Sequence, residues 1–270
     1  MYKKSGAKDS ITLNYKIPEG QSVVVTSKVV SKFDSEQMGQ TISVDMNSST
    51  VLGHKLLSVD ADNNMTVELD FIDLTQSMES PMGSGDTDYS ELIGKKAEFT
   101  LSGEGEATEK KGFSKLPEIT NINGESLKGE MYELVVDATF FKLPDHPVKV
   151  GDSWTNEDSS EMPYGGGNLK TESKTIYIIT EKLVVDGEDC FKIDITGTST
   201  TGGEFEQNGT QLAMERSSTS SGHLIFAYNK GMYLSMDVSS KTEGIIDVPA
   251  AGMKIPQTIT STTSTTVAFE

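Results

Sequence analysis

The stretch Met65-Thr-Val-Glu-Leu-Asp-Phe71 alternates strictly between apolar and polar side chains, and this alternation decides the fold class. Successive side chains of a β-strand leave opposite faces of the sheet, so a period of two indicates a strand with one face buried. Similar alternation recurs in residues 23–30, 191–196 and 232–238. The sequence therefore predicts a mainly β chain of antiparallel strands.

Turn-forming residues separate these strands. Asp60–Asn64 and Asp186–Asp189 interrupt apolar runs, and Asn229–Gly231 ends in a glycine that is free to adopt positive φ. The glycine run Pro163–Asn168 indicates a hairpin loop, and the β-branched stretch Thr258–Phe269 predicts a closing strand. These positions predict a series of hairpins.

Two of the hairpins match one another at a constant offset, which indicates an internal repeat. The matched positions are Leu57, Asp60, Met65, Val67 and Leu69 in the first hairpin and Leu183, Asp186, Phe191, Ile193 and Ile195 in the second. We therefore expect a polar, flexible leader over residues 1–10, a β-rich half over 11–142 and a related β-rich half over 143–270.

Two segments depart from the β pattern. Asp86–Ile93 begins with a capping aspartate and is followed by a glycine, which predicts a short helix. Glu125–Ala138 predicts an amphipathic helix, because its apolar side chains fall on one stripe. The expected fold is α+β of the mainly β class: an open barrel or half-barrel of antiparallel sheets in two related halves, with one or two short helices packed on the sheet.

Composition excludes several classes of protein. A net charge of −18 argues against a nucleic-acid partner, because phosphate binding relies on clustered lysines and arginines. No stretch approaches the roughly 20 apolar residues of a membrane-spanning helix. The single cysteine, Cys190, excludes an intrachain disulfide and a thiolate metal cluster. We expect no cofactor and no metal.

No motif identifies a catalytic residue, so the chain is not expected to be an enzyme. His54, His146 and His223 have no local metal-ligand spacing, and no Gly-x-Ser-x-Gly nucleophile elbow is present. Asp60–Asn64 imitates the first ligands of a calcium loop but lacks its glycine and its closing glutamate, which favours a hairpin turn. Acidic residues precede Cys190 and favour a high thiol pKa, as expected of a structural thiol.

Methionine and aliphatic residues on strands and on the 125–138 helix could instead line a cavity for an apolar ligand. Core filling is the alternative for the methionines, and a core anchor is the alternative for the only tryptophan. The candidate cavity-lining residues are Met131, Leu134, Val135, Trp154, Met232 and Met236.

The segment Phe140–Trp154, which ends Pro-Val-Lys-Val-Gly-Asp-Ser-Trp, resembles the central motif of a bacterial family of exported β-rich domains of unknown function. Leu13–Ser22 and Ile93–Lys95 also fit that family, and the resemblance covers most of residues 11–270. It implies a periplasmic, cell-surface or secreted protein, often a lipoprotein, and it supplies no catalytic residues. A looser resemblance is to the half-barrels of periplasmic lipoprotein carriers, whose curved sheet encloses an apolar cavity.

Three functions follow as hypotheses. The leading one is a non-enzymatic binding protein of the cell envelope or secreted space, with an apolar small molecule or lipid as its ligand. The alternative is a structural or interaction protein that binds a protein partner through sheet edges or loops. A hydrolase is the least favoured of the three.

Overall fold

The computed structural model describes residues 10–37, 39–122, 126–164, 166–207 and 209–270. The expected leader, residues 1–10, lies almost entirely outside the described residues. In chain order the strands are β1 (Ser22–Gln37), β2 (Gln40–Val59), β3 (Met65–Ser80), β4 (Gly83–Asp86), β5 (Lys96–Leu101), β6 (Ala107–Lys111), β7 (Ile119–Thr120), β8 (Ser126–Leu127), β9 (Ser153–Tyr164), β10 (Gly167–Val185), β11 (Glu188–Gln207), β12 (Thr210–Ala227), β13 (Met232–Val248) and β14 (Met253–Phe269). The helical elements are η1 (Phe113–Lys115), α1 (Glu130–Thr139) and η2 (Pro249–Ala251).

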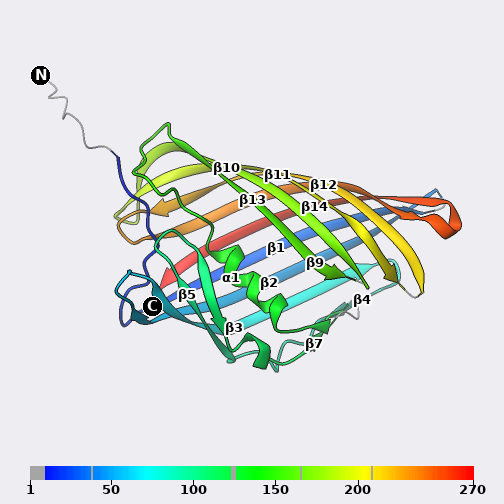
Figure 1. Cartoon of the computed structure of the whole chain (residues 1–270), viewed down its shortest axis with the longest axis horizontal. Helices are drawn as coiled ribbons and strands as arrows, with labels where there is room; N and C mark the ends of the chain where they lie inside the picture. The colour runs from blue at the N-terminus through cyan, green and yellow to red at the C-terminus, as the bar shows by residue number, and fades with distance from the viewer. Residues whose placement is uncertain (1–9, 38, 123–125, 165, 208) are drawn as a thin grey trace, which may run out of the picture.

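One 12-stranded antiparallel sheet dominates the molecule, and α1 lies across one of its faces (Figure 1). The strand order is β6-β5-β3-β2-β1-β14-β13-β12-β11-β10-β9, with β4 paired to β3, so β6 and β9 form open edges. The expected mainly β, antiparallel, open half-barrel fold is confirmed. Strands from residues 11–142 and from 143–270 join in this single sheet, where Val23 of β1 lies opposite Phe269 of β14.

The core lies between α1 and the part of the sheet that α1 covers, which we call the proximal half. We call the face toward α1 the inner face. Met65, Val67, Leu69 and Phe71 are buried there, as their alternation predicted. The strip at 191–195 is also buried as expected. Among the described residues, no helix is both long and apolar enough to cross a membrane.

The predicted turns are confirmed at Asp60–Asn64, after Asp186 and at Asn229–Gly231. The loop expected over Pro163–Asn168 includes residue 165, which lies outside the described residues, and β9 and β10 take up the residues on either side of this loop. Asp60 accepts hydrogen bonds from the backbone N–H groups of Asp62 and Asn64, at 2.9 and 2.8 Å, and so acts as a turn residue. The turn at Asn229–Gly231 joins β12 to β13, but the pairing of the two strands shifts register next to it, where Ile225 lies opposite Ser235 and Phe226 lies opposite Tyr233. The strict alternation expected over 232–238 therefore fails at its start, where the neighbours Met232 and Tyr233 are both buried.

The two helix predictions have different outcomes. The helix expected over 86–93 is wrong: a side-chain bond from the Thr87 hydroxyl to Gln76, at 2.8 Å, holds the start of this segment against β3, and turns follow. The helix expected over 125–138 exists as α1, which begins at Glu130 and ends at Thr139. Its buried side chains are Tyr132, Val136 and Thr139 rather than the predicted stripe.

The strands continue well beyond α1, and we call this remainder the distal half. Its inner face carries a second buried cluster, composed of Leu169, Phe205, Leu212 and Met214. These side chains are covered without a helix because the sheet curls inward at Gly203. A Cβ at this position would lie 2.1 Å from the backbone oxygen of Asn168, so only glycine permits the tight inward curl of the sheet.

Candidate functional site

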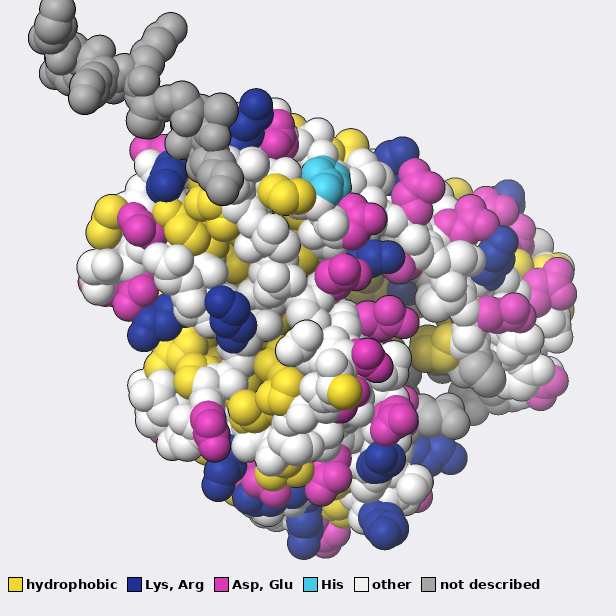
Figure 2. Space-filling model, turned by 60° about the vertical axis from the view of Figure 1, so that its left-hand side comes forward, with side chains coloured by type: hydrophobic (Ala, Val, Ile, Leu, Met, Phe, Trp, Pro, Cys, Tyr) yellow, Lys and Arg dark blue, Asp and Glu magenta, His cyan; other side chains and the backbone are white. Residues whose placement is uncertain are grey.

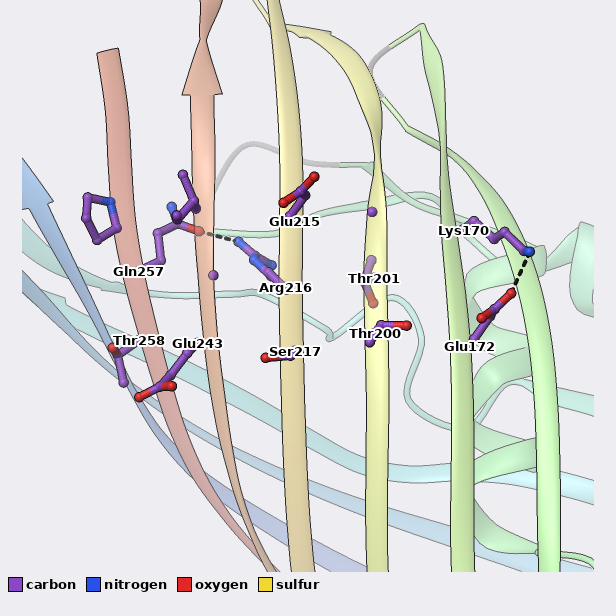
Figure 3. Close-up of a pocket in the computed structure, with 14 residues that line it drawn as sticks. Lys170, Glu172, Thr200, Thr201, Glu215, Arg216, Ser217, Glu243, Gln257 and Thr258 are labelled. Atoms are coloured by element: carbon purple, nitrogen blue, oxygen red, sulfur yellow. Dashed lines mark hydrogen bonds and ion pairs between the residues drawn. The ribbon is translucent and has the colours of Figure 1, made fainter.

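A groove of about 840 Å³ lies on the outer face of the distal half. It crosses strands β10 to β14 between two rows of outward-facing side chains (Figure 3). Register places the members of each row directly opposite one another on neighbouring strands. The first outer row is Lys170, Gly202, Glu215, Ile245 and Pro256, and the second is Glu172, Thr200, Ser217, Glu243 and Thr258.

A second groove of about 440 Å³ adjoins the first and shares Glu172 and Thr200 with it. Its other outward-facing side chains include Glu157, Ser159 and Lys174, on β9 and β10. The two grooves together form a continuous polar surface on the outer face of the distal half. A third groove of about 440 Å³ lies elsewhere, over β1 to β3.

The charges in the outer grooves are largely paired. Lys170 lies 2.6 Å from Glu172, and Lys174 lies 2.7 Å from Glu157. The hydrogen bond with Lys170 lowers the pKa of the Glu172 carboxyl, and the hydrogen bond with Glu172 raises the pKa of Lys170. These pairs are exposed and well hydrated, and acidic side chains outnumber basic ones in the lining of the two grooves, as suits a polar ligand.

Charges of both signs are interspersed on the molecular surface. Figure 2 shows acidic and basic side chains side by side on one face of the molecule, with apolar side chains in separate patches between them. The same view shows the surface hollowed on its right-hand side. This mixture contrasts with the single-sign basic surface that a nucleic acid would require.

The six residues predicted to line an apolar cavity do not lie together in any of the three grooves. On α1, Met131 and Leu134 are 38% and 55% exposed, and Val135 packs at the edge of the core. On the sheet, Met232 is fully buried and Met236 is partly buried against the core.

Trp154 occupies the position of a core anchor. Its ring stacks on Tyr177 with 4.8 Å between centroids, and Tyr177 stacks in turn on Phe141 at 5.2 Å. The indole N–H donates a hydrogen bond to the backbone oxygen of Lys142 at 3.1 Å. Burial raises the pKa of Tyr177 to about 12, which keeps its hydroxyl neutral in this stack.

We expect Trp154→Phe to lower the free energy of unfolding by about 1 kcal/mol, because it removes the hydrogen bond to the Lys142 carbonyl but keeps an aromatic ring. Urea denaturation followed by circular dichroism measures the change. The control is Met82→Leu, because Met82 is 88% exposed. Equal stability of wild type and Trp154→Phe would show that the hydrogen bond contributes nothing.

The histidines and the cysteine do not meet at a common site. His54 is buried between Phe99 and Phe140, and its Nδ1 lies 3.2 Å from the backbone oxygen of Val23. His146 is exposed beside Asp145, and His223 lies on β12. Within the described part of the chain, no group of three or more histidine, cysteine or acidic side chains could hold a metal ion.

Cys190 is buried at the start of β11. Burial and then the nearby Glu188, Asp189 and Asp186 raise the pKa of its thiol, which keeps it protonated and poorly nucleophilic. The position agrees with the structural thiol expected from the sequence.

Sequence reasoning did not find the outer grooves. Most of their side chains are ordinary hydroxyl, carboxylate and amine groups on six strands, β9 to β14, and only the register of the sheet brings them into rows. Polar alternation in the sequence predicts the outward positions of each strand, but no local motif marks where the grooves cross the strands.

No family model matches the chain, and no curated protein matches it. Three solved structures show a weak likeness. An outer membrane channel from Pseudomonas putida F1 has 8% identity and a TM-score of 0.28, over 94% of this chain and 98% of that one. OccK11 (OpdR) from Pseudomonas aeruginosa has 8% identity and a TM-score of 0.24, over 95% and 100%. A DUF1329 family protein from Desulfovibrio piger has 12% identity and a TM-score of 0.17, over 91% and 85%. Likeness at this level carries no argument about function.

Proposed function

We propose that this protein is a non-enzymatic binding protein that holds a polar ligand or partner in the grooves on the outer face of its distal half. The observation that carries the proposal is the 840 Å³ groove between the two outer rows. Its volume falls in the range of roughly 300–1,000 Å³ that is usual for ligand sites. The hydroxyl, carboxylate and amine groups on its rim, which lie beside Ile245 and Pro256, suit a hydrated polar ligand.

The composition of the groove supports binding over catalysis. No histidine or cysteine is among its lining residues, and its Lys170 and Glu172 are committed to each other. A general base or nucleophile would need a group that is free to exchange a proton with a substrate. Paired surface charges are better suited to recognition.

The cell envelope or secreted space is the proposed location. The support is the resemblance of Phe140–Trp154 to the motif of exported bacterial domains. Fractionation of the source cells tests this part independently of the groove, and recovery of the protein in the cytoplasm would contradict it.

An apolar ligand remains the second candidate, favoured by the exposed Met131 and Leu134 on α1. These side chains are three residues apart and so lie on one face of the helix. An apolar ligand would contact this face of α1 rather than the outer grooves.

Site-specific photo-crosslinking distinguishes these proposals. A benzophenone amino acid at Ser217, in the groove, is expected to give an adduct in the source cells. The matched control is Thr266, an exposed outward-facing residue on the nearby strand β14 that is outside the three grooves. Equal adducts at both positions would contradict the groove proposal, and an adduct at Leu134 alone would favour the apolar ligand. Native mass spectrometry then gives the mass of the bound molecule.

A further inference from the structure

Arg216 is the only arginine in a chain with 23 basic residues. It lies on β12, and alternation along this strand places it on the inner face with Met214 and Leu224. It therefore points away from the outer groove, although its backbone contributes to the floor of that groove. Arginine and lysine are not interchangeable, because the planar guanidinium presents a fixed fork of donors that fits carboxylate and phosphate groups.

The neighbours of Arg216 on the inner face are neutral. Register places Thr201 and Gly244 beside it, and Gln257 follows on the next strand. The side chain crosses Gly244, where a Cβ would lie 2.4 Å from Arg216 Cγ. Its Nη2 donates a hydrogen bond to Gln257 Oε1 at 2.7 Å, as Figure 3 shows.

The remaining donors of the guanidinium have no acceptor among the described residues. Nε is buried without a hydrogen-bond partner. Nη1 also has no hydrogen bond within the described chain, but it is not among the buried unpartnered atoms and so keeps contact with solvent. Nη1 is therefore the donor of the guanidinium that a ligand can reach from solvent.

The absence of a carboxylate beside this arginine is notable in a protein with 41 acidic residues. The ion pairs of the described residues involve lysines and one histidine, but not Arg216. Burial lowers the pKa of Arg216, yet a guanidinium stays charged at neutral pH. A partly buried cation without an anionic partner is costly, so an anion from outside the chain would stabilise it.

We propose that Arg216 anchors an oxyanion-binding site on the inner face of the distal half, and that the ligand is a small carboxylate or phosphate. The ligand oxygen accepts a hydrogen bond from Nη1, and Gln257 holds the guanidinium in place through Nη2. The hydroxyl of Thr201, which is hydrogen-bonded to Thr171 at 2.9 Å, flanks the site. The side chains of this site lie on the opposite face of the sheet from the outer rows, although Thr201, Arg216 and Gln257 also line the larger outer groove. The proposal does not depend on the function proposed for that groove.

A purely structural role for Arg216 predicts different behaviour. In that case the guanidinium would serve only to bridge β12 and β14 through Gln257, and added anions would act on it no more than on surface lysines. Titration with two anions therefore separates the two roles.

The uniqueness of Arg216 makes the test direct, because its Nε–H gives the only arginine Nε–H cross-peak in the ¹⁵N-¹H spectrum of the full chain. Titration with sodium phosphate and, separately, sodium acetate, at ionic strength held constant with sodium chloride, is expected to shift this peak in a saturable manner. Saturation with one anion alone supports the site and identifies the oxyanion that it prefers. Linear drift with both anions, equal to that with chloride, would overturn the proposal.

Calorimetric titration of variants gives a second readout. Arg216→Gln is expected to weaken binding of the active anion by roughly 10- to 100-fold, because it removes a charge-assisted hydrogen bond. Lys241→Gln is the matched control, because it removes the same charge from an exposed side chain on a neighbouring strand. Equal affinity of Arg216→Gln and wild type would contradict the proposal, and the wild-type titration stands alone if Arg216→Gln does not fold.

Discussion

Gly203→Ala is expected to lower the free energy of unfolding by roughly 3 kcal/mol, at the upper end of the usual cost of overpacking. The added Cβ would lie 2.1 Å from the backbone oxygen of Asn168 and 3.1 Å from the Cα of Leu169. Both obstacles belong to the neighbouring strand, so no side-chain rotation relieves the clash. Relief requires β10 and β11 to move apart, which would expose Leu169 and Phe205 of the distal cluster.

The adjacent glycine provides the matched control. A Cβ at Gly202 would meet only the backbone oxygen of Met214 at 3.5 Å, an ordinary contact distance. Gly202→Ala is expected to change stability by less than about 1 kcal/mol, because the contact is harmless and alanine restricts the unfolded chain. Urea denaturation of both variants measures the difference. Equal stability of the two would show that the distal half is not tightly curled at Gly203.

The second large effect is a dependence of stability on pH that comes from His54. Burial lowers the pKa of this histidine from 6.5 to about 4 in the folded protein. The unfolded chain therefore binds the proton first as the pH falls. The stability that the neutral ring supports is complete above pH 6.5 and is lost as the pH falls toward 4. The loss is roughly 3 kcal/mol over this window.

Comparison with a variant isolates this effect from the carboxylates, which titrate in every form of the protein. His54→Phe is expected to show a smaller decline in stability between pH 7 and pH 4, by roughly 3 kcal/mol. Met82→Leu supplies the control, since it changes an exposed side chain that does not ionise and should leave the decline unchanged. Parallel pH profiles for wild type and His54→Phe would contradict the proposed burial of His54 as a neutral ring.

The strands could be predicted because their signal is local. The alternation at Met65–Phe71 and the turn residues at Asp60–Asn64 each span only a few consecutive residues, and the structure confirms both the strand and the turn. The face of α1 could not be predicted in the same way. Tyr132 turns inward because its hydroxyl reaches the backbone oxygens of Pro117 and Leu127, both at 3.1 Å, and these partners are known only from the fold.

The two candidate sites differ in the same way, in whether any local sequence signal marks them. The outer rows depend on strand register across the whole distal half, which no single segment encodes. Arg216 did carry a signal, because it is the only arginine in a lysine-rich set of basic residues. Its meaning required the structure, which places Gln257 and no carboxylate beside it.

The pairing of β1 with β14 has a consequence for how the chain is made. The backbone groups of Ser22 and Glu270 bond to each other at 2.8 and 2.9 Å, so β14 fills the middle of the sheet although it is synthesised long after β1. Until β14 emerges, β1 and β13 each keep an unpaired side that can bind other chains. A nascent protein of this design depends on late, long-range closure, which slows folding and makes protection from aggregation most important in the interval before β14 is in place.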